Sequence, residues 1–157
     1  MTIKPKIGFL YASSYQPFYF SLSGTLIGFD LDYRNNFNVH TLSLGFNKDF
    51  EIFSSPACTY QELNYLYGRY DDKAKIRFQY QIGVGVFFGN EQDKLIRRDP
   101  GLIGHSYYTM KSYSTIAIPL KLGIYRLFKK GRAFGIDMNI NINNKYIFIS
   151  PTLGYEF

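Results

Sequence analysis

The chain has 157 residues, with 15 Tyr, 15 Phe, 14 Gly, no Trp and a formal net charge of +6. This length predicts a single domain over residues 1–157, and the aromatic content favours strands over helices. No apolar run approaches the roughly 20 residues that a membrane helix needs, and the basic residues form no stripe typical of nucleic-acid binding, so we expect no nucleic-acid partner.

Eight segments alternate between apolar and polar side chains, as strands do. The first four are predicted at residues 3–12, 18–33, 38–50 and 61–70. In the second segment the apolar alternation changes register near residues 26–28, which predicts a β-bulge. Within it, Asp30 and Asp32 fall on the polar face.

The last four strands are predicted at residues 75–88, 112–127, 132–142 and 145–157. The first of these is the clearest in the chain, because seven apolar residues from Ile76 to Phe88 occupy one face without a break. Pro119 and Pro151 cannot donate to a strand ladder, and we expect a local bulge at Pro119.

The predicted connections sort by length. Those at residues 34–36, 71–73 and 128–131 are short, those at 13–17 and 143–144 are modest, and those at 51–60 and 89–111 are longer. Short turns at one rim and longer loops at the other follow the rule for outer-membrane barrels. The sequence therefore predicts an all-β fold, an eight-stranded antiparallel up-and-down transmembrane β-barrel.

Composition decides which face points outward. The polar faces combine glycines with charges of both signs, as a narrow eight-stranded lumen requires, whereas the apolar faces of the fifth to seventh strands hold no charge over most of their length. We therefore expect the apolar faces to contact lipid. These are the charges of the polar faces: Lys6, Asp30, Glu62, Lys75, Arg77, Lys121, Asp137 and Glu156.

Buried charges are tolerated when they are paired. We expect a structural network of hydrogen bonds and salt bridges to close the lumen, formed by Glu62, Arg77, Lys121, Asp137 and Glu156. The alternative is a soluble lipocalin-like barrel with its apolar faces inward, which would bind a hydrophobic ligand in its interior. Residues 1–6 contain no apolar signal-peptide segment, which favours this alternative.

The C-terminal strand ends on an aromatic residue. Tyr155 and Phe157 share its apolar face, and this ending resembles the signal that outer-membrane barrels present to their assembly machinery, although Thr152 stands where that signal usually has glycine. With residues 62–70 and 114–120, the pattern resembles the small outer-membrane β-barrel proteins of the Bacteroidetes. The resemblance implies the cell outer membrane, the lipid bilayer and the barrel-assembly machinery as partners, and we expect a monomer.

Candidate sites for chemistry are few. A lipid A deacylase of this barrel type carries a His-x-Ser pair, but His40 and Ser43 have the wrong spacing and are expected on opposite faces. His105 has no carboxylate at a suggestive spacing, and two His with Cys58 are too scattered for a metal site. We therefore expect neither catalysis nor a cofactor.

The longest predicted connection is basic. Lys94, Arg97 and Arg98 there are expected either to be solvated or to contact lipopolysaccharide phosphates through charge-assisted hydrogen bonds.

Overall fold

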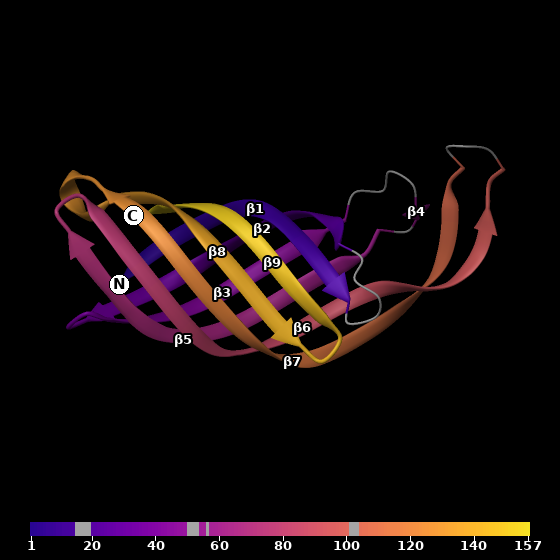
Figure 1. Ribbon diagram of the computed structural model, residues 1–157, viewed down its shortest axis with the longest axis horizontal. Helices are drawn as coiled ribbons and strands as arrows, with labels where there is room; N and C mark the ends of the chain where they lie inside the picture. Colours follow the sequence, from indigo (N-terminus) through magenta and orange to yellow (C-terminus); the bar gives the residue numbers. More distant parts are fainter. Residues whose placement is uncertain (15–19, 50–53, 56, 101–103) are drawn as a thin grey trace.

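Eight long antiparallel strands close into a barrel in the computed structural model (Figure 1), which describes residues 1–14, 20–49, 54–55, 57–100 and 104–157. Each strand pairs with its neighbours along the chain, and pairing of the first with the last closes the sheet. The prediction of an eight-stranded antiparallel barrel is confirmed. The eight strands are β1 (Thr2–Ser14), β2 (Phe20–Asn35), β3 (Asn38–Lys48), β5 (Thr59–Lys73), β6 (Ile76–Arg98), β7 (Ser106–Leu127), β8 (Ala133–Asn143) and β9 (Tyr146–Glu156).

Two short elements accompany the barrel. β4 (Ser54–Ser55) pairs in parallel with the start of β7 and was not predicted. The 3-10 helix η1 (Lys129–Gly131) is too short to cross a bilayer, and the described residues contain no helix that is long and apolar enough to do so.

The two ends of the barrel differ as predicted. Both termini lie at one end, here called the turn end, with the short connections at residues 36–37, 74–75 and 128–132 (Figure 1). Asn36, Phe37 and Ala74 have positive φ angles of 45°, 70° and 55°, as tight hairpin turns require. The other rim, the loop end, carries the connections from β3 to β5, β6 to β7 and β8 to β9.

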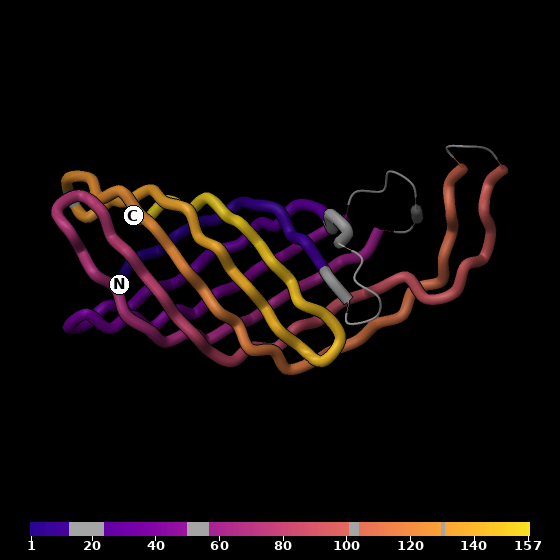
Figure 2. Tube along the Cα trace, in the orientation of Figure 1, coloured from indigo at the N-terminus to yellow at the C-terminus, as the bar shows by residue number. Residues whose placement is uncertain are grey.

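The predicted long loop at residues 89–111 is wrong. β6 continues to Arg98 and β7 begins at Ser106, so Glu91 pairs with Lys111 within a hairpin. The β6–β7 hairpin extends well beyond the loop end (Figures 1 and 2). Two register shifts between Gln92 and Arg97 break the period-two pattern there, which is why the sequence pattern did not indicate a strand.

Neither predicted bulge is present at its predicted position. Residues 26–28 pair in register with residues 6–8, and the register shift lies between Leu22 and Thr25, beside Gly24 with its φ of 116°. At Pro119 the pairs on either side, Ile82–Leu120 and Gly85–Ala117, share one register, so no residue is inserted. Proline removes a single donor from the ladder, and this loss alone does not require an extra residue.

The apolar faces point outward, as predicted from composition. Ile116, Val84 and Ile27 are 76%, 63% and 61% exposed, whereas Lys4 and Asp137 are fully buried. A lipocalin-like barrel needs the reverse arrangement, so the alternative prediction of an apolar interior along the barrel is wrong. Two residues depart from the faces predicted for them: Leu26 points inward near the loop end, and Lys75, expected inside, is exposed in the turn after Ala74.

Candidate functional site

The barrel interior collects charges in equal numbers. The buried residues include four cations and four carboxylates. Two half-buried residues, Arg34 and Glu62, add one charge of each sign. Glycines on the same inward alternation, such as Gly45 and Gly123, leave room for these long side chains. The buried charges are Lys4, Lys6, Arg77 and Lys121 with Asp30, Asp32, Asp137 and Glu156.

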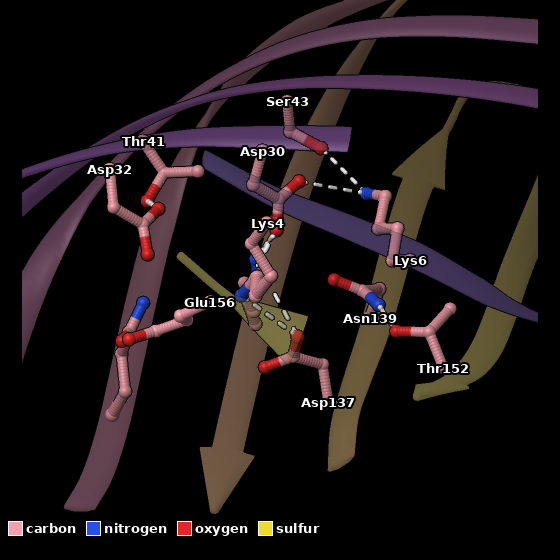
Figure 3. A network of polar contacts seen from close by, with 12 residues as sticks. Lys4, Lys6, Asp30, Asp32, Thr41, Ser43, Asp137, Asn139, Thr152 and Glu156 are labelled. Carbon is pink, nitrogen blue, oxygen red and sulfur yellow. Dashed lines mark hydrogen bonds and ion pairs between the residues drawn. The ribbon is translucent and has the colours of Figure 1, made fainter. Parts of the chain in front are cut away.

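Three lysines surround Asp30 in the lumen, and Figure 3 shows two of them, Lys4 and Lys6, beside its carboxylate. The Lys4 and Lys6 ammonium groups each lie 3.1 Å from an Asp30 oxygen, and Lys121 forms a third ion pair with the same carboxylate. Asp137 adds a second carboxylate, 3.0 Å from Lys4 and 3.9 Å from Lys121. This set of five residues is here called the lysine cluster.

Neutral groups complete the hydrogen bonding of the lysine cluster. Lys4 donates to the Tyr125 hydroxyl at 2.6 Å, and that hydroxyl donates to Asp137. Lys6 donates to the Ser43 hydroxyl at 2.7 Å. Because these charges are fully out of water, such partners are needed to offset their desolvation.

A second cluster lies toward the turn end and is built around arginines. Arg34 donates to Asp32 at 2.9 Å and also to Glu156. Arg77 donates to the other Glu156 oxygen at 2.8 Å and to Asp72 at 2.7 Å. Charge-assisted pairs of this kind are the stronger hydrogen bonds of proteins, and here they tie four strands together across the lumen.

The structure divides the five predicted network residues into three groups. Lys121 and Asp137 belong to the lysine cluster, and Arg77 and Glu156 meet directly. Glu62 contacts neither pair; it accepts a hydrogen bond from Asn141 at 3.0 Å. That the five act together to close the lumen stays a prediction.

The sequence-based set omitted two central residues. Asp30 makes three ion pairs, more than any of the five predicted members, and Lys4 makes two, as many as Lys121 or Asp137. Both lie on the inward alternation of their strands, so the period-two pattern could have found them.

An aromatic plug fills the lumen near the loop end, where a polar interior was expected. Phe87 and Phe148 stack with ring centroids 4.4 Å apart, and Tyr60 packs against both at 5.7 and 5.3 Å. Tyr113 and Tyr146 extend the plug toward the rim. Small and aliphatic residues of other strands fill the space around it: Leu10, Ala12, Leu26 and Ala117.

The loop-end rim above the plug carries its own polar contacts. Lys145 in the β8–β9 turn lies 2.6 Å from Glu91 of the hairpin, and Tyr146 donates to the same carboxylate at 2.8 Å. Just outside β3, burial raises the pKa of Asp49 to about 6, although a hydrogen bond with Cys58 opposes the shift. Cys58 is free and half-buried, and burial raises the pKa of its thiol.

Residues that could form a catalytic site or a metal site are not brought together in the part of the chain that the structure describes. Ser43 is buried in the lumen, whereas His40 lies outside, where its Nδ1 is 2.8 Å from the Tyr65 hydroxyl. The described residues include no group of three or more His, Cys, Asp or Glu that could hold a metal ion.

Fold and interior together define a class: a closed eight-stranded antiparallel barrel with an apolar exterior, matching the barrels of outer-membrane proteins. Neisserial surface protein A resembles it with a TM-score of 0.74, at 10% identity over 99% of this chain and 94% of that one. Ail, the attachment invasion locus protein of Yersinia pestis, has a TM-score of 0.58, at 10% identity over 99% and 98%.

The N-terminal β-barrel domain of Pseudomonas aeruginosa OprF has a TM-score of 0.51, at 8% identity over 99% and 97% of the two chains. At these identities the likeness shows the fold. No family model and no curated protein matches the chain.

Proposed function

We propose that this protein is a monomeric barrel of the Gram-negative cell outer membrane, with a closed lumen and a structural or surface-interaction role rather than catalysis. The observation that carries the proposal is the distribution of side chains between the two faces of the sheet, which is the reverse of that in a water-soluble barrel. Apolar side chains cover the outside, while ten charges lie buried or half-buried inside. A charge on the lipid face costs about 2–4 kcal/mol at the bilayer midplane, so this arrangement suits lipid outside and polar contacts within.

A closed lumen is supported by two kinds of filling in series. The paired charges occupy the middle and the turn end, and the aromatic plug occupies the loop end. At eight strands a barrel interior is just filled by side chains. The lumen is therefore a rigid core that holds the strands in register, and it does not conduct.

The β6–β7 hairpin is the candidate surface for interactions, because it extends beyond the loop end. Arg97 pairs with Asp99 at 2.9 Å and lies over the Tyr107 ring, whereas Lys94 and Arg98 are exposed and form no ion pair within the described residues. These cations suit the phosphates of lipopolysaccharide. Among the similar structures, one of Ail holds the heparin analogue sucrose octasulfate, which supports an anionic ligand on such a barrel.

Assembly uses the last strand in this proposal. Tyr155 and Phe157 contact each other edge to face at 4.8 Å, and Phe157 is 65% exposed at the turn end. An exposed terminal aromatic residue is available to the barrel-assembly machinery, and the contact with the Tyr155 ring orients the Phe157 ring.

Detergent dependence tests the proposal. The chain is refolded with and without micelles, and boiled and unboiled samples are compared on an SDS gel. We expect a faster-migrating unboiled band with micelles and none without them. A monodisperse folded β-protein in plain buffer would refute the membrane location.

A further inference from the structure

A furrow on the outer face of β6, β7 and β8 begins at the turn end. Its first row is formed by three paired neighbours, Ile76, Arg126 and Phe134. Ile124 and Ile136 pair in the next row, and the hollow between the rows measures about 470 Å³. The only charge in these two rows is therefore at the end nearest the turns.

The furrow continues along the three strands, whose outward side chains there are apolar except for the Tyr80 hydroxyl, and the exposed Arg69 of the neighbouring strand β5 lines its far end. A second hollow of about 550 Å³ shares Ile124 and Ile136 with the first and reaches Leu122. A third of about 460 Å³ shares Leu122 with the second and reaches Leu120 and Ile140. Six residues of β7 separate Arg126 from Leu120, which is about 20 Å along a strand. At the usual tilt of about 40° this spans about 15 Å of membrane depth, or one leaflet of a hydrocarbon core about 30 Å thick.

Cations gather at the turn end of the furrow. Lys75 lines the first hollow beside Arg126, and Lys129 and Arg132 are exposed next to it. The sequence has no acidic residue at positions 73–78 or 124–136. Lys75 and Arg126 form no ion pair within the described part of the chain, and the Arg126 guanidinium lies 6.0 Å from the Phe128 ring centroid. Arginine held in this way can bind a phosphate through two parallel hydrogen bonds.

We propose that this furrow is a binding site for an anionic glycerophospholipid. Its phosphate contacts Arg126 and Lys75, and its acyl chains lie along the furrow toward Leu120. This inference rests on the proposed function, because the furrow meets lipid only if the barrel spans a membrane. A comparable hollow of about 470 Å³ between β1 and β9 has no cation in its lining. An anionic headgroup should therefore strengthen lipid binding in the furrow but not in that hollow.

Native mass spectrometry tests the site. The refolded barrel is transferred from micelles that contain equal amounts of phosphatidylglycerol and phosphatidylcholine with identical acyl chains. We expect the native protein to retain phosphatidylglycerol in preference, and each cation removed to reduce that preference about five-fold. Lys75→Gln with Arg126→Gln should therefore reduce it about 25-fold. The matched control, Lys48→Gln with Lys111→Gln, removes two exposed lysines that lie outside the furrow, and it should leave the preference unchanged.

Equal retention of the two lipids by the native protein would overturn the inference, as would an equal loss of preference in the control variant. The gel shift between boiled and unboiled samples is measured on the same preparations. A missing micelle-dependent shift in the native protein would mean that the proposed function fails. An intact shift without lipid preference would mean that the furrow inference alone fails. If the double variant does not refold, Lys75→Gln, in an exposed turn, decides through its expected five-fold loss.

Discussion

Asp30→Asn is the most informative change in the barrel interior. The lysine cluster has three ammonium groups and two carboxylates, and Asp30 is the carboxylate that contacts all three ammonium groups. Its loss leaves Lys4 and Lys121 with Asp137 as their carboxylate partner and leaves Lys6 with the Ser43 hydroxyl. Breaking a buried ion pair from one side costs about 3–5 kcal/mol. We expect the free energy of unfolding to fall by about that much.

Lys121→Met provides the comparison within the same cluster. Without Lys121, Asp30 still contacts Lys4 and Lys6, and Asp137 still contacts Lys4. Both carboxylates stay paired, so we expect a smaller loss, about 1–3 kcal/mol. Glu62→Gln is the control, because the one side-chain hydrogen bond of Glu62 within the described residues is to Asn141, and its loss should cost about 1 kcal/mol.

Urea unfolding in micelles, followed by far-ultraviolet circular dichroism, measures the three variants against the native protein. The order of losses is the decisive result. If Lys121→Met costs as much as Asp30→Asn, or if Asp30→Asn changes the free energy of unfolding by less than about 1 kcal/mol, Asp30 is not the centre of the cluster.

Four further predictions concern the rest of the molecule. Gly123→Ala should lower the free energy of unfolding by about 1–3 kcal/mol, because its Cβ would lie 2.5 Å from Asp137 Oδ1. Gly131→Ala, with open space around it but a φ of 74°, should cost less in the same unfolding assay, and equal losses would contradict the crowding argument. Burial raises the pKa of Asp49 above its unfolded value to about 6, so this carboxyl lowers stability as pH rises from about 4 through 6; Asp49→Asn should raise the urea midpoint at pH 7.5 but not at pH 4, and a gain at both would refute the linkage. In planar bilayers the native protein should show no large stable conductance, and a steady open level would disprove a closed lumen. Deletion of Phe157 should lower the heat-modifiable fraction in cells but not after refolding into micelles; an equal loss in both would assign Phe157 to stability instead of assembly.

The sequence determined which side chains share a face. Because successive strand residues point to opposite sides, alternation along eight segments, clearest at Ile76–Phe88, was enough to predict eight strands. The composition of the two faces then predicted an apolar exterior. The short turns at the turn end followed from the lengths of the polar breaks. The same alternation placed Arg77, Lys121, Asp137 and Glu156 inside.

Tertiary structure decided which of the inward residues meet. Asp30 and Lys121 are 91 positions apart in the chain and lie on strands that do not pair with each other, so their contact depends on barrel closure, strand register and tilt. The hairpin beyond Gly89 and the aromatic plug escaped prediction for a related reason. Register shifts erase the period-two pattern in the hairpin. Alternation places Phe87 on the inner face, but only barrel closure brings its ring against Tyr60 and Phe148 of other strands.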